Sequence, residues 1–146
     1  MDKKTFMRLY ALPLDIEKRQ RRIARLEQLQ AAGPDTVSDT VQSSIDAGNA
    51  TVLCHATVRG RDAEYERREG LIRDLRQKQI QARADYAAGV KLIESCADAS
   101  VRVTLQVVCL EGGSYNDAAC EFRRRGIPKD RDGLRKAAQR WISENI

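Results

Sequence analysis

The sequence predicts a mainly all-α protein in which a long antiparallel helical hairpin with a short β-like insertion precedes a C-terminal bundle of short helices. Two long segments repeat apolar residues at helical spacing, and only 3 prolines and 9 glycines interrupt the 146 residues. The C-terminal third contains three shorter helical patterns, each bounded by a capping residue or glycine. Composition agrees, because 42% hydrophobic but only 5% aromatic residues give a thin aliphatic core.

Residues 5–32 are predicted to form the first helix of the hairpin. Its apolar side chains recur at spacings of three and four residues and therefore share one face. They are Leu9, Leu12, Ile16, Ile23 and Leu26, with the stem of Arg19 in the one gap and Leu29 widening the face. Pro13 either begins the main helix after a separate turn over residues 5–12 or kinks one long helix. Gly33-Pro34 ends it.

Residues 61–95 are predicted to form the second helix, with a heptad-like seam along its length. The seam consists of Tyr65, Arg68, Ile72, Leu75, Gln79, Ala82, Tyr86, Gly89 and Ile93. Because neither helix could bury its stripe alone, the two are expected to pair as an antiparallel hairpin. Some seam positions are polar or small, so a second copy of the chain is an expected partner through this helical arm.

The insertion at residues 33–60 is too long for a simple connecting loop without secondary structure. Alternation over residues 52–58 has the period of a strand, and the turn chemistry of residues 46–49 precedes it. A short strand or hairpin is therefore expected, and it must pair locally or with another chain.

Three helices are predicted for residues 96–146, the second expected domain beside residues 1–95. Asp98 can cap the first, which is apolar nearly all round through residue 110 and should be the buried centre. Ser114 can cap the second, residues 115–124, and Asp130 or Asp132 can cap the last. The expected inner face of the last helix is Leu134, Ala137, Ala138 and Trp141, flanked by Ile142.

These three helices match the helix-turn-helix pattern of DNA-binding proteins. Ala118-Ala119 supplies small residues where the last helix crosses, Gly126 supplies the turn, and Ile127 is expected to plug the core. Helices of this class enter the major groove by their N-terminal part. The expected contacts in the groove are therefore Lys129, Arg131, Arg135 and Lys136. Gln139 and Arg140 are expected to lie near the DNA backbone, and Arg123, Arg124 and Arg125 are expected to contact phosphates.

Residues 111–119 resemble the stretch that opens the helix-turn-helix of sigma-70 region 4, and Leu134-Arg135-Lys136 with Arg140-Trp141 resembles its recognition helix. Residues 34–44 and 51–60 are similar to the middle part of small sigma factor-like late-transcription regulators of phages and prophages of Gram-positive bacteria, the ArpU/RinA-like group. The resemblance implies a transcription regulator that binds double-stranded promoter DNA and contacts host RNA polymerase. Residues 1–95 are accounted for by the hairpin, so a complete promoter-melting sigma factor is not expected.

Two other functions are open alternatives. A phage DNA-packaging subunit of the small-terminase type also combines a helix-turn-helix with an oligomerising helical region, although its DNA-binding part usually comes first. A coiled-coil structural or adaptor protein that binds no DNA explains the hairpin equally well. The net charge of +5 permits phosphate contact without proving it.

An enzyme is not expected. The one histidine, His55, adjoins Cys54 in the predicted strand, where neighbouring side chains face opposite ways. The four cysteines lack zinc-site spacing, and no cofactor or metal motif is visible. Cys96, Cys109 and Cys120 fall on helical patterns and are expected to be buried. Without a signal peptide or an apolar membrane span, the expected location is the cytoplasm, away from membranes.

Overall fold

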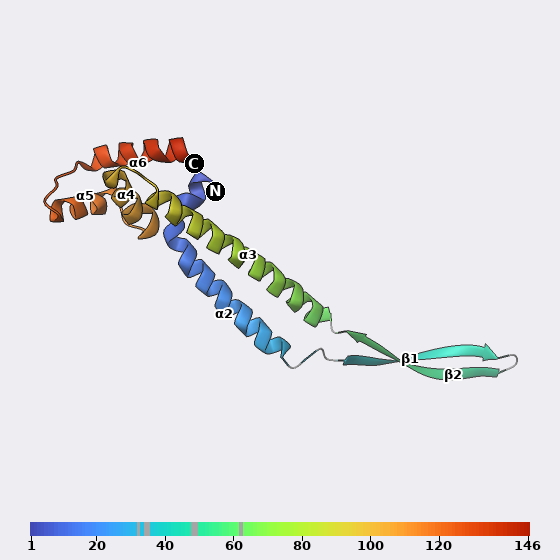
Figure 1. The fold of residues 1–146 in the computed structure, drawn as a ribbon. Helices are drawn as coiled ribbons and strands as arrows, with labels where there is room; N and C mark the ends of the chain where they lie inside the picture. The colour runs from blue at the N-terminus through green and yellow to red at the C-terminus, as the bar shows by residue number, and fades with distance from the viewer. Residues whose placement is uncertain (32, 34–35, 48–49, 62) are drawn as a thin grey trace. The chain divides into compact units, whose positions relative to one another are not determined.

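The computed structural model describes residues 1–31, 33, 36–47, 50–61 and 63–146, and the side chains of residues 1–31, 33 and 63–146. The elements, in chain order, are α1 (Lys3–Phe6), η1 (Leu9–Ala11), α2 (Leu12–Gln30), β1 (Thr36–Ala47), β2 (Ala50–Arg61), α3 (Ala63–Glu94), α4 (Ala99–Leu105), η2 (Gln106–Leu110), α5 (Tyr115–Arg124) and α6 (Arg131–Asn145) (Figure 1). The predicted mainly helical architecture is confirmed.

Contacts divide the chain into two compact units. The head unit comprises Met1–Gln20 and Gln77–Ile146, and the arm unit comprises Arg21–Arg76. Helices α2 and α3 contribute residues to both. The expected division into a helical hairpin arm over residues 1–95 and a helix-turn-helix domain over residues 96–146 stays a prediction.

In the arm unit, α2 and α3 pack antiparallel around Ile23, Ile72 and Leu75. Nearer the end of α2, the Gln30 side-chain amide donates to the Tyr65 carbonyl at 3.2 Å. Later residues of α2 therefore contact earlier residues of α3, as in an antiparallel pair. The predicted helical hairpin is confirmed in this unit.

One detail of the predicted α2 face is wrong. Leu29 is 56% exposed and does not widen the apolar face, whereas Gln30 is partly buried. Gln30 continues the spacing of three and four residues after Ile23 and Leu26, so position on the helix decides burial here, and hydrophobicity does not.

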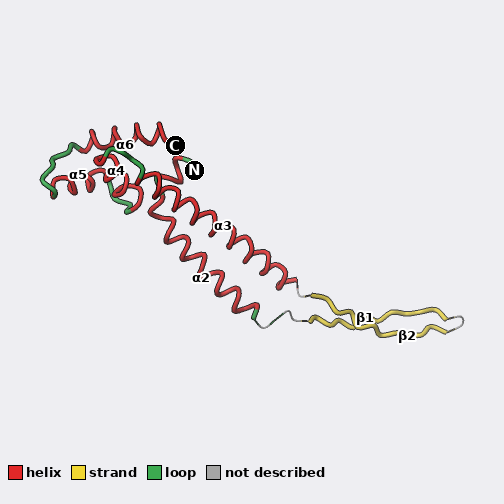
Figure 2. The backbone as a smooth tube through the Cα atoms, viewed as in Figure 1, coloured by secondary structure: helices red, strands yellow, loops and turns green. Residues whose placement is uncertain are grey.

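The insertion forms two antiparallel strands, β1 and β2, which pair from Thr36 with Arg61 to Ala47 with Ala50 (Figure 2). Each strand has 12 residues and is longer than the expected segment 52–58. The expected stop at Pro34 and the expected turn residues Gly48 and Asn49 lie outside the described residues. So do the side chains of both strands, including Cys54 and His55.

In the head unit, the N-terminal segment is broken before α2 begins. Asp2 caps α1 by accepting a 2.7 Å hydrogen bond from the Thr5 N–H, and η1 follows after Met7 and Arg8. Pro13 lies in the first turn of α2, where a missing N–H leaves no helical hydrogen bond unmade. The alternative in which Pro13 opens the main helix is therefore confirmed, and one helix over residues 5–32 is wrong.

The predicted seam of α3 is confirmed in both units. All nine of its members are buried or partly buried, whereas Ile80, outside the seam, is 70% exposed. Gly89 shows why a small residue is needed, because a Cβ at this position would overlap the buried side chain of Leu9. Arg19 also lies in the seam as expected, and its Nη1 atom is buried with no hydrogen-bond partner among the described residues.

The core of the head unit joins the two ends of the chain. Phe6 and Leu9 pack with Ile93, Leu105 and Ile142, and each of these five is at most 1% exposed. The predicted buried centre is confirmed over α4 and η2, a π-helical turn that the sequence did not indicate. The termini consequently lie close together (Figure 1).

The predicted helix starts are confirmed. Asp98 accepts hydrogen bonds from the Ser100 and Val101 N–H groups at 2.7 and 3.2 Å. Ser114 caps α5, and Asp130 caps α6 by accepting from the Gly133 N–H at 2.9 Å. Polar side chains at these positions satisfy N–H groups that the first helical turn leaves unpaired.

Candidate nucleic-acid interface

The turn between α5 and α6 is built on Gly126, whose φ of 75° lies in the left-handed region. The Gly126 N–H donates to the Arg123 carbonyl, and the Ile127 N–H donates to the Phe122 carbonyl, both at 3.0 Å. This pair of bonds is a Schellman motif, which ends a helix by satisfying its last carbonyls. The turn glycine expected from the sequence is therefore confirmed.

The expected plug at Ile127 is wrong, since its side chain is 51% exposed. Phe122, which is 5% exposed, packs in the cluster that also contains Leu134. The buried apolar residue next to the turn is therefore Phe122, at the end of α5, and not the residue after the glycine.

The contact between α5 and α6 depends on small side chains, as expected. Ala118 and Ala119 are 0% and 7% exposed and share a cluster with Leu134 of α6. An alanine lets a neighbouring helix approach closely because its side chain ends at Cβ.

The inner face of α6 differs from the expected one. Leu134, Ala138 and Ile142 are buried at a spacing of four residues, whereas Ala137 is exposed and Trp141 is only partly buried. Ile142, expected only to flank the core, is 1% exposed and central to it. The buried stripe is therefore narrower than predicted, which leaves more of α6 facing outward.

All nine predicted contact residues are exposed. They are Arg123, Arg124 and Arg125 at the end of α5, Lys129 in the turn, and Arg131, Arg135, Lys136, Gln139 and Arg140 on α6. On α6, Lys136 and Arg140 lie opposite the buried stripe, whereas Arg131 and Arg135 lie next to the start of α5, so exposed cations occupy more than one face of the helix. The structure thus leaves every predicted residue accessible to an anionic partner.

Two carboxylates hold four of these arginines. Asp132 lies 3.1 Å from Arg131 and 3.9 Å from Arg135. Such exposed pairs contribute little stability, typically about 0–1 kcal/mol, and a phosphate can replace the carboxylate at small cost.

Glu121 holds the other two arginines at the end of α5. It accepts two hydrogen bonds from Arg125, at 2.9 and 3.1 Å, and lies 3.7 Å from Arg124. Within the described part of the chain, no ion pair involves Arg123, Lys129, Lys136 or Arg140. These side chains can therefore bind an anion without first breaking an ion pair.

A hollow of about 230 Å³ brings the start of α5 beside the start of α6. Ser114, Tyr115 and Asn116 line one side, and Arg131 and Arg135 line the other. Sequence reasoning missed Tyr115 and Asn116. The capping serine before them was the available signal, because first-turn N–H groups and nearby polar side chains favour anions.

The start of α5 is held rigidly by Asp117. Its carboxylate accepts hydrogen bonds from the Ser114 N–H and hydroxyl, both at 2.7 Å, in a capping box. These bonds lower the pKa of Asp117 below its ordinary value. Burial raises the pKa of the Tyr115 hydroxyl further above neutral pH, where a tyrosine is protonated and can donate a hydrogen bond.

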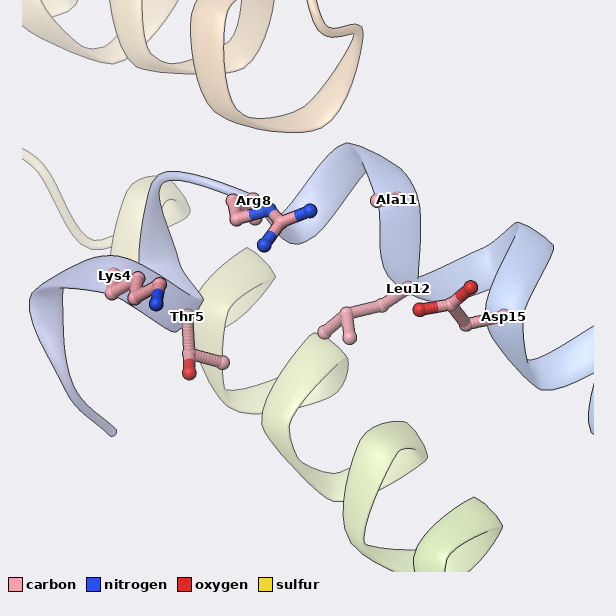
Figure 3. A pocket seen from close by; sticks show the side chains of 6 residues that line it. All are labelled: Lys4, Thr5, Arg8, Ala11, Leu12 and Asp15. Atoms are coloured by element: carbon pink, nitrogen blue, oxygen red, sulfur yellow. The ribbon is translucent and has the colours of Figure 1, made fainter.

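A second pocket, of about 210 Å³, lies at the N-terminal segment (Figure 3). Lys4, Thr5 and Arg8 meet Ala11, Leu12 and Asp15 there, without a histidine or cysteine among them. Among the described side chains, no three His, Cys, Asp or Glu residues gather closely enough to hold a metal ion.

The expectation for the cysteines is partly wrong. Cys96 and Cys109 are 2% and 0% exposed, but Cys120 is exposed. Cys120 lies on the opposite side of α5 from Ala118 and Phe122, and its side chain therefore faces outward.

Comparisons with known proteins give no assignment: no family model matches the chain, and neither a curated protein nor a solved structure matches it significantly. None of the helices among the described residues is both long and apolar enough to cross a membrane.

Proposed function

We propose that the chain is a DNA-binding transcriptional regulator of the phage or prophage type, in which α5 and α6 act as a region-4-like helix-turn-helix on promoter DNA. The observation that carries the proposal is the two-sided character of α6. Leu134, Ala138 and Ile142 bury one side in the head unit, while Lys136 and Arg140 are exposed on the opposite side and Arg131 and Arg135 are exposed next to the start of α5. An amphipathic basic helix fixed on a small bundle suits the major groove of DNA.

In this proposal the exposed residues have distinct roles. Arg131 and Arg135 leave Asp132 and donate bidentate hydrogen bonds to guanine edges or to phosphates. Lys129, Lys136 and Arg140 neutralise phosphates and supply affinity that does not depend on sequence. Asp132 then disfavours weak, non-specific DNA binding, because its negative charge repels any DNA phosphate that does not bind Arg131 or Arg135.

The hollow between α5 and α6 supports a backbone contact beside the groove. Asn116 and the Tyr115 hydroxyl can donate to the same strand that the two arginines of the hollow approach. RNA polymerase as a second partner, a dimer through the helical arm and a cytoplasmic location belong to the same proposal. A coiled-coil adaptor would account for the hairpin but gives the exposed cations of α6 no role.

The test is DNA binding by the full chain carrying Arg135→Ala and Lys136→Ala. Losing two phosphate contacts should lower the magnitude of the slope of log affinity against log salt by about 1.8, measured by fluorescence anisotropy on a labelled duplex. If Arg135 contacts a guanine edge instead, the slope should change by about 0.9 and discrimination against a changed base should also fall. Both side chains are exposed, so the thermal unfolding midpoint should stay within about 2 °C of the wild-type value.

The matched control is Lys78→Ala with Lys91→Ala, which removes the same charge from exposed positions of α3 in the head unit. The control should keep the wild-type slope. Wild-type binding at every salt concentration by the α6 variant would show that this helix does not contact DNA.

A further inference from the structure

The arm unit has a cationic surface of its own on α2. Arg21, Arg22 and Arg25 line a hollow of about 450 Å³, together with Leu26. The three arginines are exposed, and Leu26 is partly buried against the cluster of Ile23. The hollow therefore has an apolar base fixed by the hairpin core and guanidinium groups around it.

Two arginines of this surface, Arg22 and Arg25, have charges that no carboxylate of the described residues balances. No carboxylate lines the hollow, and within the described part of the chain no ion pair involves Arg22 or Arg25. Glu27, two residues after Arg25 on α2, is engaged by Arg76 of α3. Arg25 lies three residues after Arg22, a spacing at which like charges repel on a helix. An anion at this surface would relieve that repulsion.

We propose that this surface binds phosphates of duplex DNA, as a second contact separate from α6. Each guanidinium offers a planar fork of donors that matches a phosphate, and three of them on adjacent turns can engage neighbouring phosphates. An acidic protein segment fits less well, since protein interfaces need an apolar or aromatic centre and the hollow offers only Leu26.

The contact carries affinity but no base recognition. Arginines on the outside of a hairpin reach the backbone, and phosphates are the same in every sequence. The surface lies entirely in the arm unit and uses none of the residues of the α6 proposal, so either contact can exist without the other.

The experiment uses the full chain carrying Arg22→Gln and Arg25→Gln, titrated with salt on a duplex of mixed sequence. Two lost phosphate contacts should make the dependence of log affinity on log salt shallower, with a slope smaller in magnitude by about 1.8. The affinity at about 0.1 M salt should fall by up to roughly 60-fold. Circular dichroism should show an unchanged helix content, since both side chains are exposed.

The matched control is Arg67→Gln with Arg73→Gln, two exposed arginines of α3 in the same unit that do not line the hollow. An unchanged slope in the Arg22/Arg25 variant, or an equal loss in the control, would overturn the proposal. Loss of binding to a polyglutamate peptide with DNA binding intact would overturn it too. If the Arg22/Arg25 variant loses affinity while the Arg135/Lys136 variant does not, the α6 proposal fails and this one stands.

Discussion

Replacing Phe6 with alanine tests whether the N-terminal turn and the C-terminal helices fold as one core. Phe6 is 0% exposed and packs in the cluster that contains Leu105 and Ile142. Its ring centroid lies 6.2 Å from that of Trp141, with the rings tilted by 37°. The side chain therefore joins residues that lie at opposite ends of the sequence.

The expected loss follows from this burial. Removing a fully buried phenylalanine costs about 3–5 kcal/mol, from lost transfer energy and the cavity left behind. The aromatic pair with Trp141 accounts for about 0.5–1.5 kcal/mol of such a loss. A domain of this size is stable by about 5–15 kcal/mol, so Phe6→Ala should lower the unfolding midpoint by roughly 10 °C or more.

Urea unfolding followed by the fluorescence of Trp141 measures this directly, because Trp141 is the one tryptophan of the chain. Leu14→Ala is the control, since Leu14 is 55% exposed and its loss should cost less than about 0.5 kcal/mol. A loss below about 1 kcal/mol for Phe6→Ala would refute the reasoning, since so small a value cannot come from emptying a closed core site.

Three further results are expected. Gly112→Ala should destabilise the chain by about 1–2 kcal/mol in thermal melts, because φ is 73° there and a Cβ would lie 2.9 Å from the ring of Tyr10. A thiol reagent should label Cys120 in the native protein well before Cys109, whose pKa burial raises to about 11; equal rates by mass spectrometry would contradict this. Asp117→Asn should destabilise the chain at neutral pH. The hydrogen bonds from the residue before α5 lower the pKa of Asp117, so its contribution is complete above the ordinary value of 3.8 and disappears as the pH falls through the lower folded value. If the wild type still had a larger free energy of unfolding than Asp117→Asn at the lowest pH measured, this role would be excluded.

The sequence by itself determined where the C-terminal helices start and which face of the long helix α3 is buried. Asp98, Ser114 and Asp130 could be assigned as caps because a cap acts on N–H groups two or three residues away. The seam of α3 followed from its spacing of three and four residues, since that spacing alone sets which side chains share a helix face. The exposed cations of α6 were predictable for the same reason.

Only the tertiary structure decided which residues pack against each helix face. Phe6 joined the C-terminal core, Phe122 packed with Leu134 while Ile127 stayed at the surface, and Ile142 replaced Ala137 in the buried stripe of α6. Local periodicity gives the face of a helix but not the partner against which it packs. Partners distant in sequence are chosen by the shape and volume that all the packed elements leave, and no short window of sequence contains that information.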